Sequence, residues 1–343
     1  MKHLLNTLFV LTEDAYLSLE NENVVVLGEN KVLGRMPLHT LEQILYFGYK
    51  GASPALMGKC VELGIGLSFF KINGYFLAKV DGRQKGNVLL RKAQYRISDD
   101  ESRSNLAARN FIVGKLFNAR SVLERAKRDH PLSIDITKVV EVSKALKILL
   151  NNAKNAPDLD VLRGVEGEAA SRYFRAFNEL ILQNKATFNF SVRSKRPPRD
   201  PINALLSFVY SLLANDCVSA LEGVGLDSYV GFLHRDRPGR KSLALDLMEE
   251  FRSIYADRFV LTLINSKMIK PKDFEKQENG AVFLSKNAKK IILSEWQNKK
   301  KDVITHPFLN EKIPWGLVPH VQALLLARCI RGDLDEYPAF LWK

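Results

Sequence analysis

One histidine and two carboxylates lie close together in residues 229–252, which read YVGFLHRDRPGRKSLALDLMEEFR. A short apolar run ends at His234, and an amphipathic helix is predicted after the basic turn that follows. On a regular helix, Asp246 and Glu249 lie three residues apart on one face. Imidazole nitrogen and carboxylate oxygen suit a divalent cation such as Mn²⁺ or Mg²⁺. The spacing predicts part of a metal site, with Glu250 as an alternative to Glu249 because a small rotation of the helix exchanges them.

Two basic loops accompany these residues. The turn after the histidine carries Arg235, Arg237, Arg240 and Lys241. A proline-rich loop at 191–203, SVRSKRPPRDPIN, carries Arg193, Arg196 and Arg199. Cations beside a metal site suit a phosphodiester, so we expect both loops to contact the backbone of a nucleic acid.

Glu166 is the candidate for a further ligand from a distant part of the chain. A helix is expected after an N-cap at Asp158 or Asp160, and Glu166 falls on its apolar stripe. A carboxylate on a buried helix face is costly unless it is paired, neutralised or bound to metal. The flanking glycines 164 and 167 weaken the helix and suggest that another group approaches closely there. A buried salt bridge to an arginine is the alternative explanation.

Charge and composition narrow the class of protein. The 343 residues carry a net charge of +13 and are 46% hydrophobic, which excludes general disorder. Residues 1–80 hold seven basic and seven acidic side chains, so the rest of the chain carries the whole excess and is expected to meet a polyanion. The three cysteines are isolated, which indicates neither a disulfide framework nor a zinc ribbon. No membrane span or cleaved leader is indicated, so an intracellular, cytoplasmic protein is expected.

The elements predict an α+β protein with two domains. Short β-branched and aromatic runs in residues 1–80 predict a small antiparallel β domain, with helical spacing at 38–47 and 54–63 and a turn at Asn73-Gly74. Residues 81–343 are predicted to form a larger, mainly α-helical domain. Within it, Asp200 and Pro201 should begin an apolar core helix, and Asn279-Gly280 should turn a hairpin. Cations at 91–115, Lys115 among them, could face phosphates or only solvent.

Three segments resemble one known family. LRGVEGEAASRYF at 162–174, RPPRDPINALLSFVYSLL at 196–213 and GFLHRDRPGRKSLALDLMEEFR at 231–252 are similar, in the same order, to motifs of the CRISPR-associated adaptation integrase, Cas one. The likeness is greatest to the form found with compact type I systems. It implies that Glu166, His234 and Glu249 are catalytic metal ligands for Mg²⁺ or Mn²⁺, with Asp246 as a nearby candidate.

The resemblance also implies the reaction and its partners. Such a protein inserts short spacer duplexes into a CRISPR repeat by attack of a 3′-hydroxyl on a phosphodiester, and it has associated nuclease activity. It would form a homodimer through the β domain and act with the small protein Cas two in the prokaryotic cytoplasm. Two other functions stay open from the residues alone: a nucleic-acid-binding scaffold without catalysis, and a metallophosphoesterase for small substrates.

Overall fold

A computed structural model describes residues 7–29, 31–41, 43–71, 76–82, 88–190, 192–194 and 196–342. The chain divides into two compact units. The first unit comprises residues 1–85, 292–302 and 314–317, and the second comprises 86–291, 303–313 and 318–343. The predicted boundary at residue 80 and the predicted dimerising role of the β domain stay predictions.

The first unit contains two small sheets. One is antiparallel in the order β2-β3-β4, and the other has the order β1-β5-β6-β7. The strands are β1 Thr7–Val10, β2 Tyr16–Glu20, β3 Asn23–Leu27, β4 Val32–Pro37, β5 Gln43–Tyr46, β6 Gly66–Phe70 and β7 Phe76–Lys79. Side chains including Leu17, Val24, Ile44 and Leu67 are fully buried in the core of this unit.

The four-stranded sheet corrects part of the sequence prediction. β5 pairs in parallel with both β1 and β6, and only β6 and β7 are antiparallel. The parallel pair β5–β6 is possible because α1 (Pro54–Leu63) connects the two strands. Helix α1 was predicted correctly, since Ser53 accepts a hydrogen bond from the Leu56 N–H and Gly64 ends the helix in the left-handed region, with φ 71°.

The helix predicted at residues 38–47 is wrong. The segment begins with a single 3₁₀ turn, Leu38–Thr40, and continues as β5. β5 lies between two other strands, and Ile44, Leu45 and Tyr46 are all buried. A strand covered on both faces is apolar throughout, so its short apolar run does not show the alternation of a half-exposed strand. The turn predicted at Asn73-Gly74 lies outside the described residues.

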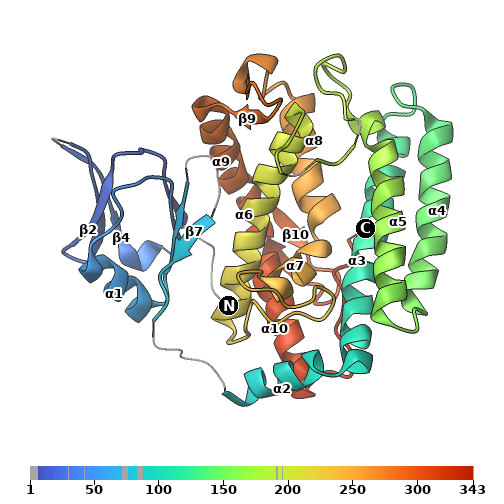
Figure 1. The fold of residues 1–343 in the computed structure, drawn as a ribbon, viewed down its shortest axis with the longest axis horizontal. Helices are drawn as coiled ribbons and strands as arrows, with labels where there is room; N and C mark the ends of the chain where they lie inside the picture. The colour runs from blue at the N-terminus through green and yellow to red at the C-terminus, as the bar shows by residue number, and fades with distance from the viewer. Residues whose placement is uncertain are drawn as a thin grey trace. The chain divides into compact units, whose positions relative to one another are not determined.

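The second unit is mainly helical (Figure 1). Its helices are α2 Val88–Ser98, α3 Glu101–Asp129, α4 Ile136–Lys154, α5 Leu159–Ala176, α6 Pro201–Gly223, α7 Ser242–Glu249, a π-helix Arg252–Asp257, α8 Arg258–Asn265 and α10 Val318–Arg331, with α9 Lys286–Lys301 divided between the units. The predicted hairpin is present as β8 (Phe274–Lys276) and β9 (Val282–Leu284), and a further short pair joins β10 (Val303–Thr305) to β11 (Lys312–Pro314). The fold class, a small β domain followed by a larger helical one, is confirmed.

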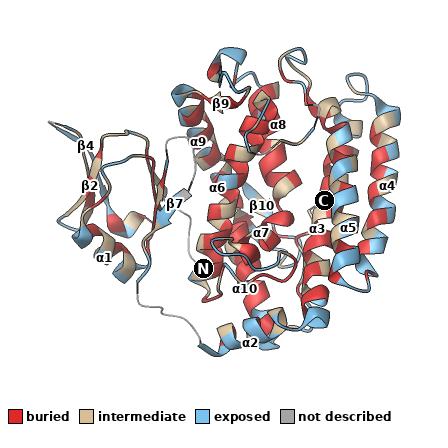
Figure 2. Ribbon diagram, viewed as in Figure 1, coloured by how far each residue is buried: buried red, intermediate tan, exposed pale blue. Residues whose placement is uncertain are grey.

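Helix α6 is the centre of this unit. Asp200 caps it by accepting the Asn203 N–H, and Pro201 is its first residue, as predicted. Buried positions run along its length (Figure 2), and it packs against α7, α8, α10, the π-helix and β9. The helix has the length and apolar composition of a membrane span, but 72% of the relevant window is buried inside the protein, as in the core helix of a folded domain.

A second group of helices positions the acidic residues. Asp100, Asp135 and Asp158 cap α3, α4 and α5 by accepting backbone N–H groups of the first turn. The three helices pack on one another, and α3 also contacts α7 and the π-helix. The long α3 therefore connects the helix that carries Glu166 to the helix that carries Glu249.

Candidate metal and nucleic-acid site

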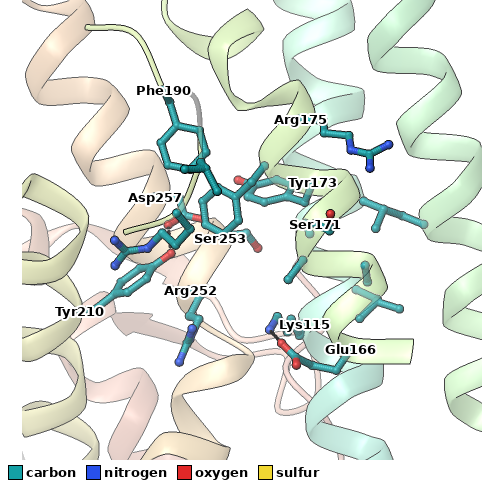
Figure 3. A pocket seen from close by; sticks show the side chains of 18 residues that line it. Lys115, Glu166, Ser171, Tyr173, Arg175, Phe190, Tyr210, Arg252, Ser253 and Asp257 are labelled. Atoms are coloured by element: carbon teal, nitrogen blue, oxygen red, sulfur yellow. Dashed lines mark hydrogen bonds and ion pairs between the residues drawn. The ribbon is translucent and has the colours of Figure 1, made fainter. Parts of the chain in front are cut away.

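Glu166 and Glu249 meet at a single ammonium group. Lys115 of α3 forms ion pairs with Glu166 of α5 and, at 2.7 Å, with Glu249 Oε2 of α7. Figure 3 shows the Lys115 and Glu166 side chains directed at each other. Burial lowers the pKa of Lys115, but Glu249 and Glu166 raise it by more, so the net shift is upward. The two predicted ligands are thus brought together, with a cation between them.

Glu249 is the buried member of this pair. Its side chain is 3% exposed, against 27% for Glu166, and its Oε1 lies 2.9 Å from a guanidinium nitrogen of Arg252. Burial alone would raise the pKa of Glu249, but the positive charges of Arg252 and Lys115 lower it to about 2. Glu249 is therefore a carboxylate at neutral pH. Glu166 is only half-buried, and its ion-pair partner is a lysine and not one of the arginines considered from the sequence.

Asp246 holds the loop that carries His234. It is fully buried and accepts the backbone N–H groups of Phe232, Leu233 and His234 at 2.6, 3.0 and 3.1 Å. Its Oδ1 also lies 2.6 Å from His234 Nδ1. A carboxylate has no proton to give, so Nδ1–H is the donor and the other ring nitrogen, Nε2, keeps its lone pair. These bonds occupy both oxygens of Asp246, which fits a residue that orients a ligand better than a ligand itself.

Arg163 connects α5 to the same loop. Its Nε and Nη2 donate to the Leu233 carbonyl at 3.1 and 2.9 Å, and its Nη1 pairs with Asp160 at 2.6 Å. Arg163 lies three residues before Glu166, so a single side chain fixes the loop of His234 relative to the helix of Glu166. No local pattern of residues indicates this contact, because its two ends are 70 positions apart.

The residues present fit a divalent cation in their chemistry. Among the described residues no three His, Cys, Asp or Glu side chains are grouped closely enough to hold one, and the Lys115 ammonium lies between the two carboxylates. However, Glu249 Oε2 is buried and accepts no well-directed hydrogen bond within the described chain. Together with Glu166 and His234 Nε2, it offers the oxygen and nitrogen donors that Mg²⁺ and Mn²⁺ accept. Metal binding would require Lys115 to move aside.

Glu250, the alternative to Glu249, faces another part of the protein. It is fully buried and bonded to Tyr337, Phe340 and Gln322 near the C-terminus. Burial raises the pKa of Glu250 to about 8, which its three hydrogen bonds only partly offset. The geometry favours Glu249 as the acid of the site.

The glycines beside Glu166 have open surroundings. A Cβ atom built on Gly164 or Gly167 would meet nothing within 4 Å among the described residues. The close approach expected from the sequence is therefore not found within the described part of the chain. This face of α5 is free of side-chain bulk next to a half-buried carboxylate.

The cations predicted to contact DNA differ in their solvent exposure and in the hydrogen bonds they make. Arg196, Arg199, Arg235 and Arg237 are exposed, while Arg240 and Lys241 are half-buried. Burial and the charge of Arg237 lower the pKa of Arg240, so these two cations repel each other. Arg193 differs, because it donates to Asn203, Ser194 and Ser207 and stacks on Tyr210 at 5.5 Å. Its bonds fix the proline-rich loop against α6.

A cavity of about 450 Å³ adjoins the ion pairs. Lys115, Glu166 and Arg252 line one end (Figure 3), and aromatic side chains including Tyr173, Phe174 and Phe190 line the rest. The Tyr210 hydroxyl donates to the buried Asp257 at 2.6 Å. The guanidinium of Arg252 stacks on the Tyr210 ring, 5.0 Å from its centroid. No place for Arg252 at this site was predicted from the sequence, although Arg252 follows Glu249 by three residues and so lies one helical turn away. From the sequence, Lys115 was grouped with cations that could face phosphates or only solvent, and its ion pairs with the two glutamates were not predicted.

Comparison with known proteins identifies the family. Residues 8–298 match the family described as CRISPR associated protein Cas1. The chain belongs to the Cas1 family. It is 48% identical to the CRISPR-associated endonuclease Cas1 1 of Chlorobaculum tepidum over 343 residues, which is 100% of both proteins. The predicted family and the predicted class of enzyme, a CRISPR-associated endonuclease, are confirmed.

Two solved structures share the fold of this chain. A casposase bound to an integration product is 22% identical, with a TM-score of 0.84 over 99% of this chain and 95% of that chain. A Cas6-RT-Cas1–Cas2 complex is also 22% identical, with a TM-score of 0.81 over 100% of this chain and 36% of that chain. At this identity the likeness concerns the fold, in agreement with the helical second unit that carries the candidate site.

Proposed function

We propose that this Cas1 protein is a metal-dependent DNA integrase of CRISPR adaptation with associated endonuclease activity. It inserts short spacer duplexes into a CRISPR repeat. The observation that carries the proposal is the meeting of Glu166 and Glu249 at Lys115, with the loop of the Asp246-oriented His234 tied to the Glu166 helix by Arg163. Exposed arginines follow the histidine on the same loop. Membership of the family supports it.

Glu166, Glu249 and His234 Nε2 would hold Mg²⁺ or Mn²⁺, with Asp246 as the residue that orients the imidazole. The bound ion would polarise the target phosphate and stabilise the leaving oxygen. His234 is assigned as a ligand and not as a general base, with the lone pair of Nε2 directed to the ion while Asp246 holds the Nδ1 proton. Lys115 and Arg252 lie beside the carboxylates and can neutralise charge on the phosphate.

The reaction exchanges one phosphodiester for another. The 3′-oxygen of the spacer strand bonds to phosphorus in the repeat while the bond from phosphorus to the repeat's own 3′-oxygen breaks. The attacking hydroxyl loses its proton to water, and the displaced strand leaves with a protonated 3′-hydroxyl. In the endonuclease reaction, water replaces the 3′-hydroxyl as the attacking group.

The DNA-binding surface is proposed to include the seven predicted cations: Arg193, Arg196, Arg199, Arg235, Arg237, Arg240 and Lys241. Exposure of Arg196, Arg199, Arg235 and Arg237 supports direct contacts with phosphates. The bonds of Arg193 support a role in shaping the loop as well. The DNA would be the spacer duplex together with the CRISPR repeat, bound in the prokaryotic cytoplasm.

The proposed assembly is a homodimer that acts with Cas2. Exposed apolar side chains on β4, among them Val32, Leu33 and Met36, support a protein interface on the first unit. The solved Cas6-RT-Cas1–Cas2 complex supports Cas2 as the partner.

A strand-transfer assay tests the proposal. The protein is incubated with a branched DNA that imitates a half-integrated spacer, in Mg²⁺, Mn²⁺ or EDTA. Metal-dependent rejoining of the repeat strand is expected for the wild type and is expected to be lost in Glu166→Gln. Glu168→Gln is the matched control, because Glu168 lies on the same helix but pairs with Arg172 on an exposed surface.

The assay also separates the proposal from the second candidate. A scaffold that only binds nucleic acid would use the Lys115 ion pairs as permanent structural contacts. It would bind the branched DNA in EDTA and in metal alike and release no rejoined strand. Full rejoining by Glu166→Gln would show that this carboxylate is not part of the reaction.

A further inference from the structure

The last residues of the chain are bound inside the second unit. Tyr337 and Phe340 are buried, and Trp342 lies beside α3, where its N–H donates to Asn118. The ring of Phe340 contacts those of Phe251 and His306, with centroids 5.8 and 5.3 Å apart. A segment without regular secondary structure is therefore packed into the core of this unit.

Buried polar groups fix this segment to Glu250. Tyr337 OH lies 2.6 Å from Glu250 Oε1, and the Phe340 N–H donates to Oε2 at 2.5 Å. Gln322 of α10 donates to Oε2 and to the Tyr337 oxygen. His306 completes the network, because its Nδ1 accepts two backbone N–H groups and its Nε2 faces the Gln322 oxygen at 3.1 Å.

Asn118 connects the same segment to α3. Its amide donates to the carbonyls of Glu250 and Phe340 at 2.8 and 2.6 Å, and its oxygen accepts the Trp342 N–H at 2.9 Å. Asn118 lies one helical turn after Lys115. All its polar atoms are thus used to join the end of α7, the C-terminal segment and α3.

Gly114 shows how closely these parts pack. A Cβ atom placed there would lie 3.0 Å from Glu250 Cγ and 3.4 Å from the Ala339 Cβ. Gly114 precedes Lys115, just as Glu250 follows Glu249. In the ion pair between Lys115 and Glu249, each residue therefore has a sequence neighbour, Gly114 or Glu250, that packs against residues 337–342.

We propose that residues 337–342 form a strap that sets the distance between Glu249 and Lys115, with Glu250 and Asn118 as positioning residues for the metal site. Glu250 and Asn118 touch neither substrate nor metal. The inference rests on the proposed function for its consequence, because the strap matters to catalysis only if Glu249 is a metal ligand. The contacts themselves predict a measurable effect in metal-free protein.

The test compares variants of the full chain. Glu250→Ala removes the acceptors of the strap, Glu250→Gln keeps an oxygen for the Phe340 N–H, and Phe340→Ala alters the strap without changing α7. Leu284→Ala, in the buried face of β9, serves as the control for a general loss of stability. Each variant is measured by hydrogen exchange in EDTA, by Mn²⁺ titration calorimetry and by DNA binding in EDTA.

In EDTA, faster exchange of the amides of residues 247–252 is expected in Glu250→Ala and Phe340→Ala but not in Leu284→Ala. In both strap variants the Kd for Mn²⁺ should rise about tenfold or more, the size seen when a partner of a metal ligand is removed. Glu250→Gln should restore most of the affinity. DNA binding in EDTA should be unchanged throughout.

Unchanged exchange at 247–252 in folded Phe340→Ala would overturn the strap, as would an equal loss of Mn²⁺ affinity in Leu284→Ala. If the wild type bound no Mn²⁺, the proposed metal site would fail, but the exchange measurement would still decide whether the strap holds α7. The two failures are therefore distinguishable.

Discussion

Asp246 offers the sharpest test of how the histidine is positioned. Asp246→Ala removes the acceptor of three backbone N–H groups and of His234 Nδ1, and Asp246 itself is fully buried. Each buried donor left unsatisfied costs about 1 kcal/mol or more. The free energy of unfolding should fall by at least about 3 kcal/mol, a large part of the typical stability of a domain. Urea denaturation in EDTA measures this loss without metal.

Asp246→Asn separates stability from function. An amide oxygen in place of Oδ2 keeps the bonds from Phe232 and Leu233, so most of the stability should remain. The amide N–H₂ then faces His234 Nδ1 and favours the tautomer with its proton on Nε2, the nitrogen proposed to bind metal. The Kd for Mn²⁺ should rise about 10- to 100-fold, and strand transfer should fall with it.

Two results would refute this reasoning. If Asp246→Asn kept wild-type Mn²⁺ affinity and strand transfer, the carboxylate would not control the tautomer of His234. If a metal-bound crystal structure placed an Asp246 oxygen about 2.1 Å from the ion, Asp246 would be a direct ligand.

Three further predictions concern neighbouring parts of the second unit. Burial raises the pKa of Asp257 from 3.8 to about 6, only partly offset by Tyr210 and other neighbours. The folded protein thus holds this proton more tightly than the unfolded chain. The contribution of Asp257 to the free energy of unfolding is therefore fully present below pH 4, and about 3 kcal/mol of it is lost as the pH rises through 6. Asp257→Asn should remove this part of the pH dependence in denaturation curves, and an unaltered profile would contradict the assignment. Arg163→Ala should slow strand transfer about 10- to 100-fold by freeing the carbonyl before the proposed ligand histidine, with DNA affinity unchanged. Arg163→Lys should not restore the rate, because its one ammonium nitrogen cannot replace both the two-nitrogen contact with Leu233 and the pair with Asp160. Full activity of Arg163→Ala would count against this role. Reversing Arg237 and Arg240 to Glu should reduce the slope of log DNA affinity against log salt concentration by about 2, while Mn²⁺ affinity stays constant. The control, Lys272→Glu on an exposed 3₁₀ turn, should leave this slope unchanged. If the reversals lowered only the thermal stability, the loop would have a structural role and no contact with DNA.

Local signals made several elements predictable from the sequence. The Asp200-Pro201 pair fixes the start of α6, and Asn279-Gly280 fixes the hairpin, because caps and tight turns depend on residues a few positions apart. β5 was mistaken for a helix because its conformation depends on pairing with β1 and β6. Neither partner is identified by the residues of β5 itself.

The acidic residues of the candidate site could be nominated from the sequence, but the cations that pair with them could not. Glu166 was conspicuous as an acid on an apolar stripe, and Glu249 followed from its spacing to Asp246. The ion pairs of Lys115 were not predictable, because they join α3 to side chains 51 and 134 positions away and leave no pattern in α3. The spacing of Asp246 also fitted a ligand, and only its four hydrogen bonds show that it anchors a loop.

Lys115 makes the candidate site self-neutralising. Without metal, two carboxylates facing one another would repel, and the ammonium group between them removes that penalty. If these acids hold a divalent ion, as proposed, loading is an exchange of one cation for another, and the apparent affinity is the difference between two binding free energies. Such a protein can fold and assemble before it meets its metal, and the metal concentration at which it becomes active is set by its own lysine as well as by its ligands.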